Sequence, residues 1–418
     1  MTTSPATDEA ISHAPQDPRL AGHVPVLDGV RGIAILAVII FHAVTFETHN
    51  RFELALAMGA AFGWAGVDLF FVLSGFLITG ILLKARGGAG YYRTFYLRRS
   101  LRIFPLYFAL CAALFVVMPT IYGWHSPTGE MLTAAAPWYL TYTLNIRMAL
   151  FGGAGAVFTT SFLWSLAVEE QFYLLWPAIV KRVRLELLSR LCLAIVVAAL
   201  FWRIWMVSTG HVMAGYVLLP SRMDGLAMGA WLAIQVTRPG MLDRLARIAT
   251  PLLAVCMVAL LAIVAKVGQA GWEKPAMGTI GLTFTALASA ALIVLVVAGG
   301  ERTLLSRAVA VAPLRFFGRY AYGLYVLADA GTRLLKLTGL PSLVPKIVLG
   351  SAVPWAIWNL ALILLFTTAL ALLSWTLIER PALSLKRFFP YAEGKRVVPA
   401  YSVPIPGEVR VRGELEQT

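Results

Sequence analysis

Three ionisable side chains lie within an otherwise apolar stretch near the start of this 418-residue chain. The stretch, LDGVRGIAILAVIIFHAV, begins at Leu27 and contains Asp28, Arg31 and His42. Ionisable side chains inside a membrane span are costly, and they usually face a bundle interior or a watery path. Arg31 and His42 are eleven positions apart, so on a helix they share one face and lie roughly 16 Å apart along its axis. We therefore expect them to line one surface at two depths.

Five more ionisable residues are expected at the depth of His42, on three other apolar stretches. They are Asp68, Glu169, Glu170, Arg222 and Asp224. Most of these ionisable residues also have a structural interpretation: His42 as a hydrogen-bonded packing residue, Asp28 with Arg31 as an ion pair at i,i+3, Arg222 with Asp224 as another pair, and at least one of the two glutamates as a structural or cavity-edge residue. Because each of these charges needs a partner in the membrane, their convergence favours a functional site.

General base catalysis is the chemistry that this set supports. The histidine side chain titrates near neutral pH, and a carboxylate that orients its ring helps it to take a proton from a hydroxyl. Asp68 and Glu169 are both candidates for that carboxylate, and the sequence does not decide between them. No nucleophilic serine is indicated, because Ser74 lies in FVLSGF, which is not a G-x-S-x-G motif. The chain also has no phosphate-binding glycine motif and no cluster with metal-ligand spacing, so we predict no metal.

The composition indicates a membrane protein rather than a soluble one. The chain is 59% hydrophobic and only 13% charged, about half the charge of a soluble domain. Its net charge of +14 is better explained by basic loops that orient membrane spans than by nucleic-acid binding. Its three cysteines lie far apart in apolar runs, which excludes a disulfide framework as the basis of the fold.

Ten segments are long and apolar enough to be read as membrane spans. They lie near residues 27–46, 65–83, 103–120, 163–180, 191–208, 217–236, 249–267, 276–298, 319–337 and 348–377. Alternate loops are basic, which predicts an all-α, polytopic fold with about ten transmembrane helices and both termini in the cytoplasm. Residues 132–151 are expected at the outer surface or in a re-entrant hairpin, because a full crossing there would place later basic loops outside.

The expected domain organisation is one membrane domain between two tails. Residues 1–23 and 388–418 are polar and contain proline, so we expect disordered cytoplasmic tails around a membrane domain over residues 24–387. Residues 1–22 also lack the basic start and apolar stretch of a signal peptide.

Several motifs together resemble the acyltransferase-3 family of bacterial membrane O-acyltransferases, across residues 24–387. The leading motif, an Arg and a His separated by ten residues, stands here as LDGVRGIAILAVIIFH. It is followed in order by GVDLFFVLSGFLIT, FYLRRSLRIFPLY, WSLAVEEQFYLLWP, SRMDGLAMG and LIERP. One departure is AYGLYVLADA, where Ala328 stands at a position that holds His in many members. The chain resembles the stand-alone form, without a fused esterase-like domain.

The resemblance implies an acyl-CoA donor, most simply acetyl-CoA, and a hydroxyl acceptor. His42 would be the general base, with Arg31, Asp68 and Glu169 as the other catalytic residues. Arg99, Arg102 and Arg31 would bind the donor phosphates, because guanidinium groups bind phosphate bidentately. Acceptor contacts would come from a separate set: Arg222, Asp224, Glu170 and Trp164. The simpler structural interpretation of Trp164 is an aromatic residue at the membrane–water interface.

The expected setting is the bacterial inner membrane, where the enzyme would acylate a sugar of a polysaccharide, lipopolysaccharide or peptidoglycan-related glycan, or a small molecule. An acyl-enzyme relay and direct transfer are both open. A flippase of a lipid-linked glycan would use the same buried charges, and a membrane-tethered binding protein is a third alternative.

Overall fold

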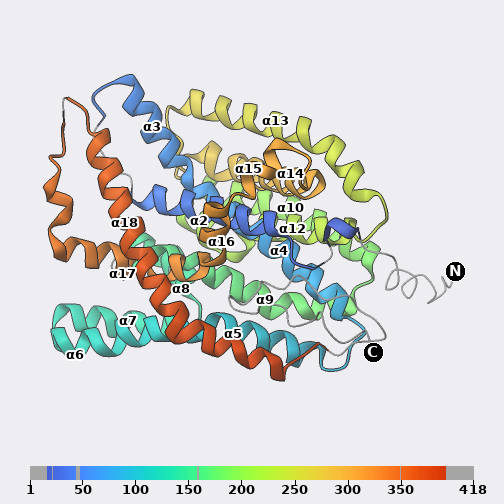
Figure 1. Cartoon of the computed structure of the whole chain (residues 1–418), viewed down its shortest axis with the longest axis horizontal. Coiled ribbons are helices and arrows are strands. Elements are labelled where there is room, and N and C mark those ends of the chain that lie inside the picture. The colour runs from blue at the N-terminus through green and yellow to red at the C-terminus, as the bar shows by residue number, and fades with distance from the viewer. Residues whose placement is uncertain (1–16, 21, 44–47, 158–159, 349, 392–418) are drawn as a thin grey trace, which may run out of the picture.

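The computed structural model describes residues 17–20, 22–43, 48–157, 160–348 and 350–391. Within these ranges the regular structure is helical, apart from one isolated bridge between Val348 and Ser351. Most residues of the two predicted tails lie outside the described ranges. Figure 1 gives the arrangement of the helices.

The helices pack as one bundle in which most long helices run between two ends (Figure 1). The longer helices are α2 (Pro25–Ala43), α3 (Arg51–Ala61), α4 (Ala65–Ala85), α5 (Tyr91–Ala112), α7 (Pro127–Leu140), α9 (Trp164–Arg182), α10 (Leu185–Ser208), α12 (Leu219–Gln235), α13 (Met241–Val267), α14 (Leu282–Gly299), α17 (Ala321–Thr338) and α18 (Val353–Ser374). The shorter ones are α6 (Met118–Tyr122), α8 (Leu144–Phe151), α11 (Val212–Val217), α15 (Leu304–Val309), α16 (Ala312–Arg319) and α19 (Arg380–Ser384).

Seven helical segments of the described chain are long and apolar enough to cross a membrane. They are residues 25–43, 51–85, 91–122, 185–208, 241–267, 277–299 and 353–388. The prediction of an all-α polytopic membrane protein is therefore confirmed. Each of the seven coincides with a predicted span, and the other three predicted spans coincide with α9, α12 and α17. These three helices hold the buried charges discussed below, which makes them less apolar than the rest.

Glycines bring the helices that carry these charges into very close contact. A Cβ atom added to Gly75 of α4 would lie 2.0 Å from the carbonyl oxygen of Leu226, and one added to Gly229 of α12 would lie 1.9 Å from that of Val72. Only glycine allows the two backbones to approach so closely. The crossing fixes the position of Asp68 and Arg222, which lie toward one end of it on the two helices.

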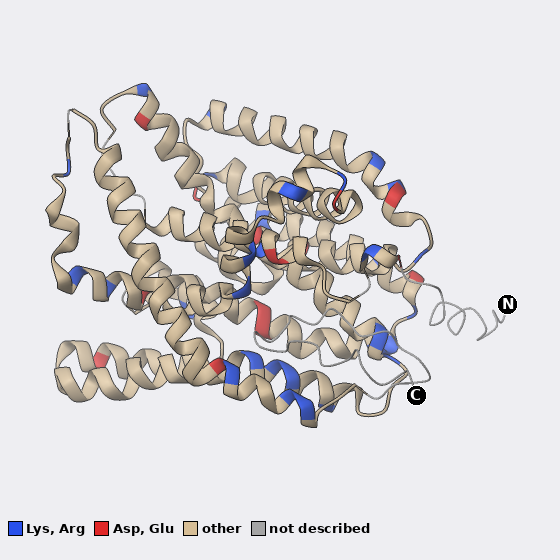
Figure 2. Ribbon diagram, viewed as in Figure 1, with Lys and Arg blue, Asp and Glu red and all other residues tan. Residues whose placement is uncertain are grey.

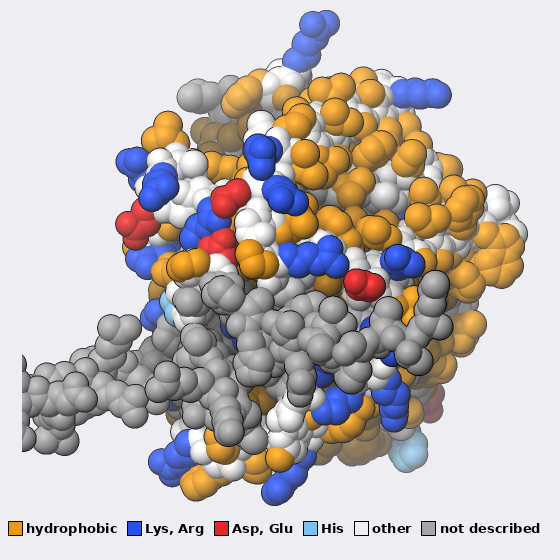
Figure 3. All heavy atoms as spheres, turned by 90° about the vertical axis from the view of Figure 1, so that its right-hand side faces the viewer, with side chains coloured by type: hydrophobic (Ala, Val, Ile, Leu, Met, Phe, Trp, Pro, Cys, Tyr) orange, Lys and Arg blue, Asp and Glu red, His pale blue; other side chains and the backbone are white. Residues whose placement is uncertain are grey.

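Lys and Arg residues gather at one end of the bundle, which we call the basic end and define by Arg86, Arg93, Lys181, Arg182 and Arg184. Arg86 donates to the carbonyl of Val183 at 2.9 Å, and Lys181 donates to that of Arg86, so the α4–α5 loop is tied to the end of α9. Figure 2 shows basic residues along α5, and Figure 3, which faces this end, shows Lys and Arg between hydrophobic patches.

The region of residues 132–151 forms parts of two helices rather than one crossing. Helix α7 ends at Leu140 and α8 begins at Leu144. Tyr142, in the turn between them, has φ of +53° and is the one non-glycine residue with positive φ in the described chain. The seven candidate spans do not include either helix.

Short pieces of both predicted tails are ordered. Residues Pro18–Leu20 form a 3-10 turn in which Leu20 is 2% exposed, and Arg19 pairs with Asp17 at 2.5 Å and with Asp243 of α13 at 2.7 Å. At the other end, Arg98 of α5 donates to the carbonyl of Phe389 at 3.0 Å. The helical domain therefore extends beyond both expected boundaries.

Candidate functional site

His42 lies one residue before the end of α2 and has a fixed tautomer. Its Nδ1 atom is 2.8 Å from the carbonyl oxygen of Val38. A carbonyl can only accept, so Nδ1 carries the hydrogen and Nε2 keeps its lone pair. The ring makes edge contacts with Phe41 and Phe162, at centroid distances of 4.9 and 5.8 Å. His42 as a whole residue is exposed, while its ring packs against these two aromatic side chains.

The two carboxylates that the sequence offered for orienting His42 have other partners. Asp68 pairs with Arg222, Oδ1 to Nη2, at 2.7 Å. Glu169 lies beside the hydroxyl groups of Ser74 and Tyr173, which are hydrogen-bonded to each other. The backbone carbonyl one turn earlier on α2, rather than a carboxylate, therefore orients the imidazole. Sequence patterns give no sign of this, since every helical residue has such a carbonyl.

Arg31 lies on the same helix, three turns before His42, and forms the ion pair expected at i,i+3. Its Nη1 atom is 2.9 Å from Oδ1 of Asp28, while Oδ2 of Asp28 is 2.7 Å from Nε2 of His23. Asp28 is 3% exposed. The Asp28 carboxylate thus holds the Arg31 guanidinium in place inside the bundle, where the guanidinium keeps its positive charge.

Three guanidinium groups, those of Arg31, Arg99 and Arg102, lie close enough for their charges to act on one another. Arg99 lies over the ring of Tyr173, with its Cζ atom 3.9 Å from the centroid, and its buried Nε atom has no partner. Lys386 also lies within electrostatic range of Arg99 and Arg102. Mutual repulsion makes such a cluster unfavourable by itself, so it is suited to an anion such as a phosphate.

Two buried ion pairs connect α12 with its neighbours, in place of the Arg222–Asp224 pair that the sequence suggested as a structural interpretation. Arg222 pairs with Asp68 of α4, while Asp224 pairs with Arg203 of α10 at 2.7 Å. All four residues are at most 1% exposed. Arg203 interrupts the apolar run FWRIW, which is a sign in the sequence of a buried charge on α10.

The two arginines differ in how completely they are satisfied. Besides its pair, Arg203 donates to the carbonyl oxygens of Ser221 and Thr279 and to the hydroxyl of Thr283, at 2.6, 3.2 and 2.5 Å. By contrast, Nε and Nη1 of Arg222 have no hydrogen-bond partner. Arg203 therefore has a structural environment, whereas Arg222 keeps donors for a further group.

Trp164 lies inside the bundle rather than in an interfacial belt. It is 5% exposed, and its ring lies 6.1 Å from Phe71 and 5.0 Å from Tyr216. The Cζ atom of Arg222 is 5.8 Å from the Trp164 ring and 5.1 Å from the Tyr216 ring. These aromatic rings enclose the Arg222 guanidinium. Aromatic faces attract a cation, so they stabilise this charged group away from water.

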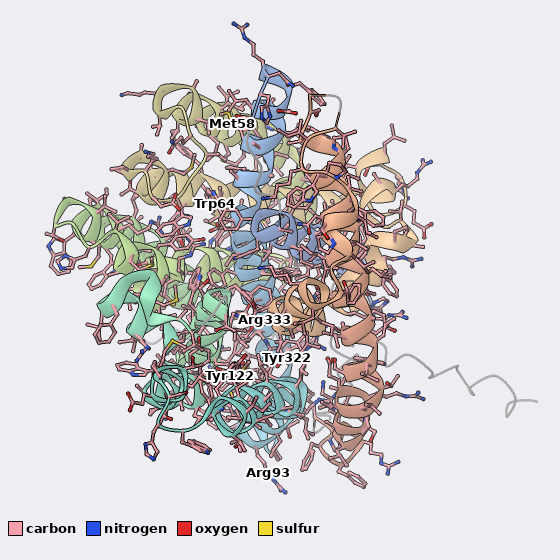
Figure 4. All side chains as sticks on the ribbon, turned by 90° about the vertical axis from the view of Figure 1, so that its left-hand side faces the viewer. Met58, Trp64, Arg93, Tyr122, Tyr322 and Arg333 are labelled. Carbon is pink, nitrogen blue, oxygen red and sulfur yellow. The ribbon has the colours of Figure 1, made fainter. Side chains whose placement is uncertain are left out.

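Tyrosines connect the parts of the site and were missed by sequence reasoning. The Tyr325 hydroxyl of α17 lies 2.5 Å from both Oγ of Ser165 and the carbonyl oxygen of Phe162, and the Phe162 ring contacts His42. Tyr322, one turn earlier, donates to the carbonyl of Ile103 at 2.5 Å. In Figure 4 Tyr322 lies toward the middle of the bundle, while Arg93 points away at its periphery. Neutral hydroxyls carry no sequence signal that separates them from packing residues.

No group of side chains in the described ranges could hold a metal ion. The polar groups described above are guanidinium, imidazole, carboxylate and phenol groups on α2, α4, α5, α9, α12 and α17. Such a set can bind anions and move protons.

Comparisons with known proteins agree with the motif-based resemblance. The chain is similar to "Putative peptidoglycan O-acetyltransferase YrhL" of Bacillus subtilis, with 27% identity over 383 residues, which is 86% of this chain and 55% of that protein. It is also similar to "Peptidoglycan O-acetyltransferase OatA" of Listeria monocytogenes, with 29% identity over 327 residues, 73% of this chain and 48% of that protein. The chain thus spans about half the length of the curated relatives it matches. No solved structure matches it.

A family model described as an acyltransferase domain matches residues 24–380 of the chain. This match covers His42, the basic cluster on α5 and both buried ion pairs. The chain belongs to this acyltransferase family.

Proposed function

We propose that the chain is a membrane O-acyltransferase that moves a short acyl group, most simply acetyl, from acyl-CoA to a hydroxyl of a cell-envelope glycan. The family match supports the reaction class, and the names of the similar proteins, peptidoglycan O-acetyltransferases, support the glycan. A peptidoglycan-type acceptor is favoured by those names over lipopolysaccharide.

The observation that carries the proposal is the fixed tautomer of His42. With Nδ1 bonded to the Val38 carbonyl, Nε2 accepts the proton of the acceptor hydroxyl as its oxygen attacks the thioester carbonyl carbon. The carbon–sulfur bond then breaks, and the proton passes from the imidazolium to the leaving thiolate. This direct transfer needs no acyl-enzyme, which is consistent with the absence of a G-x-S-x-G motif.

The donor would bind through the basic cluster. Arg99, Arg102 and Arg31 supply positive charge for the phosphates of CoA. Glu379 lies within electrostatic range of Arg102 and accepts from Ser374 at 3.0 Å. We place the basic end in the cytoplasm of a bacterium, by the rule that basic loops stay inside.

The acceptor side would use the groups around α9 and α12. Arg222 retains two unpartnered nitrogens for a sugar oxygen or for the oxyanion that develops during transfer. Trp164 helps to enclose Arg222, and Glu169 lies on the same helix as Trp164. Asp224 was expected to contact the acceptor, but its pairing with Arg203 makes it a structural residue that holds α12 against α10.

The test is the acyl content of envelope glycans from cells with and without the gene, measured by mass spectrometry after mild release. An ester-sized mass difference that disappears in His42→Ala, with the protein still in the membrane, supports the proposal. Unmodified glycan retained inside the cell would indicate a flippase instead, and unchanged glycan acylation in His42→Ala would refute the base assignment.

A further inference from the structure

Three buried polar atoms, one of them in the basic cluster, have no hydrogen-bond partner. They are Oη of Tyr142, Oε1 of Glu170 and Nε of Arg99. They come from three different elements: the α7–α8 turn, α9 and α5. A buried polar group without a hydrogen bond is unfavourable, and natural proteins keep few of them. Three together therefore suggest a site whose partner is a ligand.

Glu170 and Tyr322 link the three groups electrostatically. The Glu170 charge acts on both the Tyr142 phenol and the Arg99 guanidinium, and the phenol of Tyr322 lies within range of all three. A side-chain hydrogen bond connects α9 with the α7–α8 turn. Gln171, the neighbour of Glu170, donates from Nε2 to the carbonyl of Tyr142 at 2.9 Å. Gln171 also donates to Oδ1 of the buried Asn145 at 2.9 Å.

Tyr142 is held in place at a cost to its backbone. Its φ of +53° is a left-handed conformation that tyrosine rarely adopts and that persists only where the surroundings impose it. Its ring is stacked on Tyr107 with centroids 4.3 Å apart and lies 5.9 Å from Phe104. The residue is 9% exposed, yet its hydroxyl has no partner. The fold thus imposes strain to deliver a phenol to this region.

We propose that Tyr142, Glu170 and Arg99 bind a neutral amide of the pantetheine arm of the acyl-CoA donor. A phosphate would be repelled by the Glu170 carboxylate, and a cation by Arg99. A neutral group that both donates and accepts satisfies all three atoms: an amide N–H donates to Oε1 of Glu170, while its carbonyl accepts from the guanidinium and the phenol. Arg99 belongs to both sites, so the arm would leave the phosphate cluster directly at this point.

This inference rests on the proposed function, and the two fail in different ways. The experiment measures, with purified protein in lipid nanodiscs, the dissociation constants of CoA and of adenosine 3′,5′-bisphosphate, which has phosphates but no pantetheine arm. Tyr142→Phe and Glu170→Gln should each weaken CoA binding about five- to tenfold, the loss of one hydrogen bond to a neutral or charged group. Binding of the bisphosphate should not change, whereas Arg102→Ala should weaken both ligands.

Tyr107→Phe is the matched control. It removes a hydroxyl from the same aromatic stack, but that hydroxyl already donates to the carbonyl of Tyr139 at 2.8 Å. It should leave the ratio of the two dissociation constants unchanged, even where it lowers stability.

Two outcomes would overturn the inference. One is an equal effect of Tyr142→Phe on both ligands, or no effect on either, which would mean that water alone satisfies these atoms. The other is a raised KM for the glycan with unchanged CoA binding, which would assign the three atoms to the acceptor. If wild-type protein binds neither CoA nor the bisphosphate, the proposed donor itself is wrong.

Discussion

Asp68 and Arg222 form an ion pair between α4 and α12 with a 2.7 Å contact, and neither residue is more than 1% exposed. The pair uses only part of each group, because Oδ2 of Asp68 and two nitrogens of Arg222 have no partner. It therefore holds a desolvated guanidinium at the site while leaving it able to bind another oxygen. Removing a partner of a buried pair is strongly destabilising, since the other charge is left uncompensated.

Asp68→Asn should lower the free energy of unfolding by about 3–5 kcal/mol because Arg222 loses its counter-charge. The measurement is the thermal unfolding midpoint of detergent-purified protein. Asp243→Asn is the matched control, because Asp243 also pairs with an arginine at 2.7 Å but has a side chain that is 61% exposed. It should change stability by less than about 1 kcal/mol. Equal shifts in the two variants would contradict this account of the buried pair.

His42→Ala should reduce acyl transfer by roughly 10²–10⁴-fold, the usual contribution of a general base. The assay is transfer to a soluble glycan fragment by membranes that contain equal amounts of protein. His125→Ala is the control, since His125 is exposed in the turn before α7 and should be dispensable.

Arg31→Lys keeps the charge but loses the planar fork, so it should restore little of the activity that Arg31→Ala loses.

Arg99→Lys should raise KM for acyl-CoA by about tenfold or more, because lysine cannot bind a phosphate bidentately and stacks less well on Tyr173. Initial rates over a range of donor concentrations measure this change. Arg93→Gln, on the same helix but exposed, removes one positive charge without touching the cluster and should leave KM within about twofold. A similar rise in both variants would mean that general basicity, not this cluster, binds the donor.

Gly318→Ala should prevent α16 from packing on α2. The new Cβ would lie 1.7 Å from the carbonyl oxygen of Asp28, the residue that holds Arg31. Overpacking of this kind costs about 1–3 kcal/mol or more, so the yield of monodisperse protein in size-exclusion chromatography should fall. Gly87→Ala, which places a Cβ with no atom within 4 Å, should leave the yield unchanged. Normal yield of both variants would show that the contact can relax.

The positions of the helices could be predicted from sequence because each depends on local apolar length. All ten predicted spans coincide with helices. Arg31 and His42, which begin and end the Arg–His motif, share one face of α2 because helix geometry fixes their spacing. The sequence also predicts that α4, α9 and α12 contribute to one region. Leu20 and Phe389, just outside the predicted domain boundaries, make contacts with distant segments that no local pattern shows.

The sequence by itself determined an all-α membrane protein, the motifs of its family and the residue types that its site can use. Only the tertiary structure decided which groups pair: Asp224 with Arg203 rather than Arg222, Asp68 with Arg222 rather than His42, and the Val38 carbonyl with the imidazole. The reason is physical. A helix sets the direction of each side chain, but its partner depends on how closely two helices cross, and here glycines at the α4–α12 crossing set that distance.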